Sequence, residues 1–120
     1  MTPPELLAAA QRLLDRPDAR TAAIWPRAAA LLARQALEQG LDAYWRGRGL
    51  ALERVGTRQQ LICLPAFLSD AGAGARAAHA WSSLTGACHH HPYELSAGHD
   101  ELRAWLVDVS ALLAGLERRS

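Results

Sequence analysis

The chain has no lysine: its 13 basic residues are all arginine, and they are balanced by 12 acidic residues. This balance excludes a protein that coats nucleic acid through net charge alone, although a local group of arginines can still hold a few phosphates. No apolar run reaches the roughly 18 residues that cross a bilayer, and no basic region followed by an apolar run opens the chain. We therefore expect a cytoplasmic protein without a membrane partner.

Cysteine is also scarce. Cys63 and Cys88 do not form a Cys-x-x-Cys pair, so the pattern favours two buried thiols in a reducing compartment. Paired carboxylates, Gly-rich phosphate loops and His-Glu-x-x-His patterns are absent as well. The sequence therefore contains no standard enzyme motif, and we expect no cofactor.

What the sequence does contain is apolar residues at helical spacing. Its 120 residues match one domain over 1–120, long enough to bury one core. No stretch alternates apolar and polar residues as a half-buried strand does. The sequence therefore predicts an all-α fold, an up-down bundle of four or five helices.

Proline and glycine mark the expected helix ends. We expect residues 70–74 to form a flexible turn, Pro65 to kink the third helix, and Ile62 to face the core. The tryptophans fall on inward stripes and are expected in the core. The five expected helices run from Pro3 to Arg16, from Thr21 or Pro26 to Gly47, from Gly56 to Leu68, from Ala75 to His91, and from Ser96 or Gly98 to Arg119.

One segment, 88–91, reads Cys-His-His-His and holds three of the five histidines. Cysteine and histidine are preferred ligands of zinc and copper. However, adjacent helical residues diverge by about 100°, and structural zinc ligands are normally two to five residues apart. Helical phase sends Cys88 and His91 to the core side and His90 to another face, so we assign no metal site. The candidates, if a metal binds, are Cys88, His89 and His99, with an oxygen from Asp100.

The sequence His91-Pro92-Tyr93, just before the last helix, resembles a motif of the HEPN superfamily of small helical bundles. In that motif an Arg is followed after four to six residues by a His, often with an aromatic two positions later. The segment Arg27–Glu38 is similar to the alanine- and arginine-rich second segment of such domains, and Glu101–Leu116 to their closing helix. The resemblance implies metal-independent RNA cleavage at a dimer interface, with the His in acid-base chemistry on the 2′-hydroxyl or leaving oxygen.

The chain departs from this pattern at the arginine. Positions 84–86 read Leu-Thr-Gly, so no guanidinium grips the scissile phosphate from the expected place, and Arg76 or Arg103 could replace it only if the fold brings one close. We therefore predict a homodimeric HEPN-like binding module for RNA, a nucleotide or a protein partner. Its expected binding residues are His89, His90, His91, Tyr93, Arg76 and Arg103.

Two alternatives stay open. The first is a divergent metal-independent ribonuclease, in which His91 or His90 is catalytic and an arginine comes from elsewhere. The second is a regulatory or structural bundle that binds a metal through the histidine run. Whether the protein is an enzyme is left undecided by the sequence.

Overall fold

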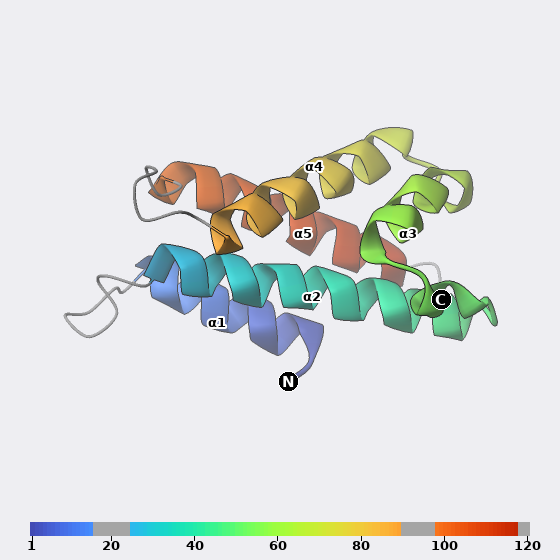
Figure 1. The fold of residues 1–120 in the computed structure, drawn as a ribbon, viewed down its shortest axis with the longest axis horizontal. Coiled ribbons are helices and arrows are strands. Elements are labelled where there is room, and N and C mark those ends of the chain that lie inside the picture. Colours follow the sequence, from blue (N-terminus) through green and yellow to red (C-terminus); the bar gives the residue numbers. More distant parts are fainter. Residues whose placement is uncertain (16–24, 90–97, 118–120) are drawn as a thin grey trace.

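The computed structural model describes residues 1–15, 25–89 and 98–117. Within these ranges the chain forms five α-helices and two short 3-10 helices, with no β-strand, which confirms the all-α prediction (Figure 1). In chain order the elements are α1 (Pro3–Asp15), α2 (Trp25–Gly47), η1 (Ala51–Arg54), α3 (Thr57–Cys63), η2 (Leu64–Phe67), α4 (Ala71–Cys88) and α5 (His99–Glu117).

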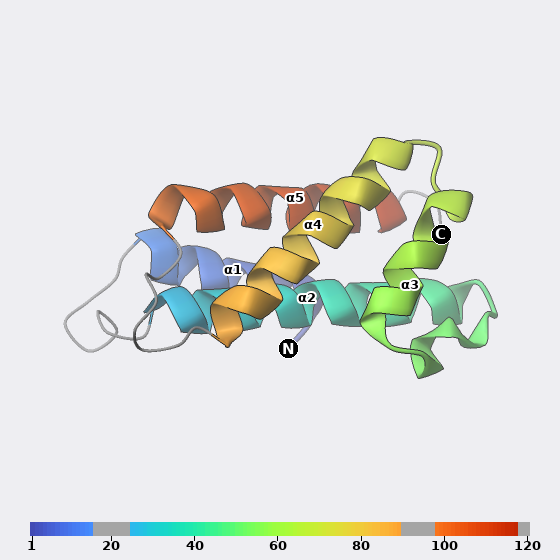
Figure 2. The ribbon, with the colours of Figure 1, turned by 45° about the horizontal axis from the view of Figure 1, so that its top comes forward.

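The helices form an elongated bundle of 45 × 26 × 24 Å. Helices α1, α2 and α5 follow its long axis, while α4 crosses them obliquely (Figure 2). The short α3 lies at the end of the bundle where α2 finishes. None of the described helices combines the length and the apolar character that a membrane span requires.

Helix α2 is the centre of the packing, because α1, α4 and α5 all contact it. Its buried face carries alanines in the first half, which let neighbouring helices approach closely, and large side chains in the second half. Helix α5 supplies a leucine-rich stripe opposite, as predicted. The buried residues of α2 are Ala29, Ala30, Ala33, Ala36, Leu37, Leu41, Tyr44 and Trp45, and those of α5 are Leu102, Leu106, Val109, Leu112, Leu113 and Leu116.

The ends of the first two helices agree with the sequence prediction. The Thr2 hydroxyl accepts a hydrogen bond from the Glu5 amide at 3.3 Å, and the Glu5 carboxylate accepts one from the Thr2 amide at 3.1 Å, which is a capping box. Pro26 lies in the first turn of α2, where its missing N–H costs nothing. Other helix ends were predicted at Arg16, Thr21, His91, Ser96 and Arg119, which lie outside the described residues.

The predicted turn over residues 70–74 is wrong, because α4 begins at Ala71. The Asp70 carboxylate accepts hydrogen bonds from the amides of Gly72 and Ala73 at 2.9 and 3.3 Å, so it satisfies two amides that have no partner in the helix. Gly74 lets this helix pack closely on η2, since a Cβ there would lie 3.1 Å from Pro65 Cγ. Its role is close packing and not chain flexibility.

The third helix also differs from its prediction. The chain is helical to Cys63 and continues as the 3-10 turn η2, which contains Pro65, so the expected kink is a change of helix type. Ile62 is 71% exposed, which contradicts its inward assignment. Its neighbours Leu61 and Leu64 are buried, and one step along a helix rotates Ile62 about 100° away from Leu61.

A buried glutamine joins α3 to α2. Gln60 is only 2% exposed, and its Oε1 accepts a hydrogen bond from Trp45 Nε1 at 3.1 Å. Its Nε2 donates to Asp42 Oδ1 at 3.2 Å and to the Val55 carbonyl at 3.0 Å. Every polar atom of this side chain is thus paired, as a buried amide requires.

We predict that Gln60→Leu lowers the free energy of unfolding by about 2 kcal/mol, because the buried Trp45 N–H loses its acceptor. The measurement is urea denaturation followed by tryptophan fluorescence or circular dichroism. Trp45→Phe should lower the free energy of unfolding less in the Gln60→Leu background than in the wild type, because in that background it removes the unpaired Trp45 N–H. Gln59→Leu, at an exposed neighbouring position, is the matched control. Additive costs in the double variant would contradict the proposed pairing.

Candidate functional site

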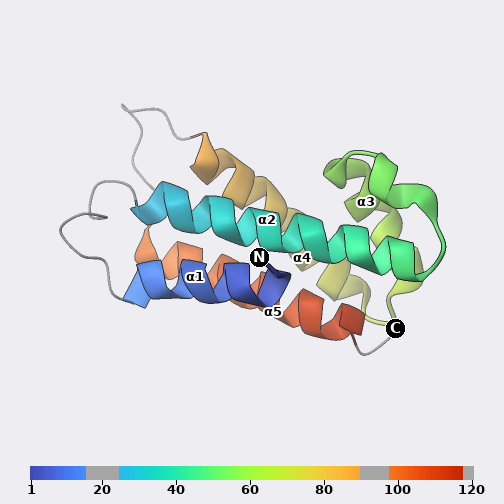
Figure 3. The same ribbon diagram turned by 90° about the horizontal axis from the view of Figure 1, so that it is seen from below.

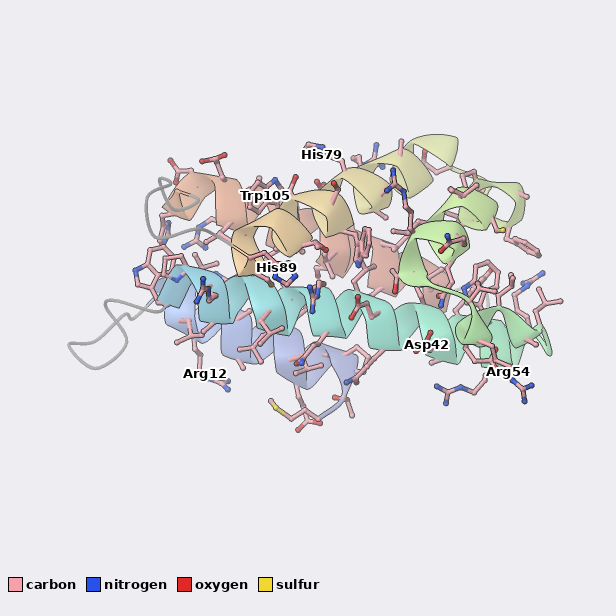
Figure 4. All side chains as sticks on the ribbon, in the orientation of Figure 1. Arg12, Asp42, Arg54, His79, His89 and Trp105 are labelled. Carbon is pink, nitrogen blue, oxygen red and sulfur yellow. The ribbon has the colours of Figure 1, made fainter. Side chains whose placement is uncertain are left out.

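The histidine-rich segment begins where α4 ends. His89 caps the helix, and its backbone amide donates to the carbonyls of Thr85 and Gly86, both at 3.2 Å. The His89 side chain is exposed near α2 (Figure 4). His90, His91 and Tyr93, the other predicted members of the site on this segment, lie outside the described residues.

His99 and Arg103, on the first turns of α5, are both tied to the end of α1. A ring nitrogen of His99 lies 2.7 Å from the Leu14 carbonyl, and the His99 ring lies 5.7 Å from that of Trp25. Arg103 donates to Asp15 Oδ1 at 2.9 Å. This hydrogen bond, with a weaker one from Gln11, lowers the pKa of the Asp15 carboxyl. Both predicted site residues therefore have structural contacts in the bundle.

Arg76 does not reach the histidine-rich segment. It lies in the early part of α4 and pairs with Asp70 at 3.2 Å. At 1.5 Å of rise per residue, it is separated from His89 by about 20 Å along the helix. The sequence left Arg76 and Arg103 as possible replacements for the arginine missing from the HEPN-like motif. Arg76 is distant from His89, and Arg103 is paired with Asp15.

Cys88 is half-buried on the core side of α4, as the helical phase predicted. Burial raises the pKa of its thiol. The negative charge of Glu38 raises this pKa further, while the positive charges of Arg34 and Arg27 lower it. A thiol of this kind is protonated at neutral pH and is a poor nucleophile or metal ligand. Among the described residues, no group of three or more His, Cys, Asp and Glu side chains could hold a metal ion.

The charged residues that act on Cys88 all belong to helix α2, and none of them is among the site residues predicted from the sequence. We call this contact the α2–α4 seam and define it by Arg27, Arg34 and Glu38 of α2 with Trp81, Thr85 and Cys88 of α4. The two helices run antiparallel here, so that the later turns of α4 meet the earlier turns of α2. The last residue of the seam on α4 is Cys88, and His89 follows it as the C-cap of that helix.

Glu38 organises the seam. Its Oε2 accepts a hydrogen bond from Trp81 Nε1 at 3.1 Å and one from Thr57 Oγ1 at 3.5 Å, and it lies 3.8 Å from Arg34 Nε. One carboxylate therefore joins α2, α3 and α4. Because both tryptophan and arginine can only donate, Glu38 is the acceptor on which their positions depend.

Two polar atoms of the seam are buried without a hydrogen-bond partner among the described residues, Arg34 Nε and Thr85 Oγ1. The Arg34 side chain as a whole is 22% exposed. A partly desolvated guanidinium can bind an anion, and the Glu38 carboxylate 3.8 Å away offsets part of the Arg34 charge.

The sequence contained one signal for the seam. Arg27, Arg34 and Glu38 interrupt the alanine-rich part of α2 at intervals of seven and four residues, which places them on one helix face. The partner of that face was not visible, because the contact with α4 joins residues far apart in the chain.

Fold and site together describe an all-α bundle with a polar interhelical seam beside a histidine-bearing helix end. No family model, curated protein or solved structure matches the chain. The chemistry of the described side chains is therefore the basis for assigning a function.

The sequence predicted a buried Cys63, but this prediction is wrong, because Cys63 is exposed at the end of α3. We predict that Cys63 reacts faster with a disulfide reagent at neutral pH than Cys88. Cys63→Ser and Cys88→Ser each leave one thiol, and the reaction rate is measured against pH. The rate for Cys88 should rise at a higher pH than the roughly 8.5 of a free thiol. Arg34→Gln should move that rise to higher pH still, because it removes a charge that lowers the pKa. Equal rates and equal pH profiles for the two thiols would contradict the burial argument.

Proposed function

We propose that this protein is a HEPN-like binding module that holds the phosphate groups of RNA at the α2–α4 seam and does not cleave the RNA. The HEPN resemblance involves the first half of α2 and most of α5, which are helical, whereas its motif at His91-Pro92-Tyr93 lies outside the described residues. The observation that carries the proposal is the position of Arg34 at the contact of α2 with α4, where Glu38 lies 3.8 Å from Arg34 and accepts a hydrogen bond from Trp81 of α4 at 3.1 Å. Arg27 lies two turns earlier on the same face of α2.

Arginine is suited to this role because its planar guanidinium binds phosphate oxygens in pairs. Arg27 and Arg34 supply two positive charges within two turns of one helix, and the Glu38 carboxylate 3.8 Å from Arg34 offsets one of them. His89 follows at the end of α4. The phosphate backbone provides most of the affinity in sequence-independent RNA binding. A small positive site of this kind fits a chain whose net charge is only +1.

Binding is favoured over cleavage by the state of the other ionisable groups. Arg76 and Arg103 pair with Asp70 and Asp15, and the Cys88 thiol has a raised pKa. An acid-base site needs a group with its pKa near the working pH together with a cation that stabilises the developing charge. The homodimer and the roles of His90, His91 and Tyr93 remain predictions.

The test is fluorescence anisotropy with a labelled single-stranded RNA of about 12 nucleotides, within the usual site size for one domain. Wild type should bind, with an affinity that falls linearly on a log-log plot against salt. Arg34→Gln should weaken binding and reduce the slope of that plot by about 0.7, the value for one lost phosphate contact on a single strand.

Arg12→Gln is the matched control, because Arg12 is an exposed arginine of α1 on the opposite side of α2 from His89 (Figure 4). It should leave the affinity and the slope unchanged. No binding by the wild type at low salt would overturn the RNA proposal. An equal loss in Arg12→Gln and Arg34→Gln would show nonspecific attraction in place of a site at the seam.

The same RNA separates binding from cleavage. After incubation in EDTA, the RNA should keep its length with wild type and with His91→Ala. Cleavage by wild type that disappears in His91→Ala would replace the binding module by the ribonuclease alternative. Sedimentation of the free protein at the assay concentration checks the predicted homodimer.

A further inference from the structure

A groove of about 720 Å³ lies at the opposite end of α2 from the histidine-rich segment. Three elements line it: the start of α1, the last turns of α2 and the last turns of α5. The volume is within the range of small-molecule sites, about 300–1,000 Å³. The residues used below are Gly40, Tyr44, Gly47, Arg48, Leu116 and Glu117.

The groove exists because α1 is shorter than the helices beside it. Helix α1 has 13 residues and α2 has 23, which correspond to lengths of about 20 and 34 Å. The later turns of α2 and α5 continue past the start of α1 (Figure 3). The uncovered face of α2 carries Gly40, Ala43 and Gly47. Gly40 lets the Leu113 side chain pack directly against α2, because a Cβ there would clash with Leu113, whereas Gly47 leaves space open. A Cβ added at Gly47 would meet no atom within 4 Å.

Tyr44 gives the groove a polar group. The residue is 7% exposed, and its hydroxyl is buried without a hydrogen-bond partner among the described residues. A buried hydroxyl in this state is unfavourable, and a partner for it would be stabilising. Around it the lining is mainly apolar, with Leu113, Leu116, Pro3 and Pro4.

Arg48 supplies a positioned charge at the rim. Its guanidinium carbon lies 5.5 Å from the Tyr44 ring centre and 5.2 Å from that of Phe67, and such contacts hold a cation in place. No carboxylate of the described residues lies within 4.0 Å of it. Glu117, which also lines the groove, already has an interaction partner. The groove therefore offers a ligand the Arg48 cation at its rim and, below the lining surface, the buried Tyr44 hydroxyl, which a ligand reaches by entering between the helices.

We propose that this groove binds a small amphipathic carboxylate, with the apolar tail against Leu113 and Leu116 and the carboxylate at Arg48. The Tyr44 hydroxyl donates a hydrogen bond to the ligand. The planar guanidinium matches a carboxylate in geometry as well as charge. This site is independent of the proposed RNA-binding function, because no residue is shared between the groove and the α2–α4 seam.

Calorimetric titration with octanoate, octanol and octylamine tests the charge at constant tail length. Octanoate should bind most tightly and octylamine least. Arg48→Gln should reduce octanoate affinity about tenfold, as expected for a lost charged hydrogen bond, and change octanol affinity by less than about twofold. Equal binding of all three ligands, or none, would overturn the proposal.

A pair of glycine substitutions locates the site. Gly47→Leu adds a side chain to the groove where a Cβ meets no atom within 4 Å, and it should abolish octanoate binding. Gly86→Leu places the same side chain at another helical glycine with open space around it, outside the groove, and should leave binding unchanged. Circular dichroism checks that both variants fold. Loss of binding in neither variant, or in both alike, would place octanoate elsewhere and contradict the proposal.

Tyr44→Phe tests the hydroxyl separately. The thermal midpoint should stay the same or rise, because an unpaired buried group is removed, while octanoate affinity should fall about fivefold. A lower midpoint with unchanged octanoate affinity would mean that the hydroxyl serves the fold and not the ligand.

Discussion

The structure depends on one packing constraint, the close approach of three helices to helix α2. Ala29, Ala30, Ala33 and Ala36 are fully buried on that helix. Alanine has the highest helix propensity and the smallest side chain that still favours a helix, so it stabilises α2 and at the same time brings its neighbours near. Because alanine buries little area, the larger apolar contribution comes from the facing leucines of α1 and α5.

The polar groups of α2 then fix how the helix is rotated. Glu38 and Asp42 are half-buried carboxylates, and each accepts hydrogen bonds from side chains of α3 or α4. A different rotation would leave these carboxylates without donors, which is costly away from water. The same rotation brings Arg34 beside Cys88, so the interactions that hold α3 and α4 also place the arginines on which the proposed function rests.

The two ends of α2 differ in chemistry. At its start, the arginines of the α2–α4 seam lie beside the end of α4 and suit a charged polymer bound through phosphate. At its end, small residues and a shorter α1 leave a groove with an apolar lining, Arg48 and an unpaired Tyr44 hydroxyl. The seam is formed by charged and polar side chains, whereas the groove is the space left beside small side chains. A search for motifs detects the first kind more readily than the second.

The sequence by itself determined the all-α class, the start of α1, the leucine stripe of α5 and the core side of Cys88, because each follows from local propensity and helical period. It was wrong for residues 70–74, where the Asp70 cap outweighs local glycine content. It was also wrong for Ile62, which helical rotation places away from the buried Leu61. Only the tertiary structure decided that Arg76 is far from His89 and that Arg34 meets Cys88. The physical reason is that helical period fixes which residues share a face, while the partner of that face depends on contacts between helices far apart in the chain.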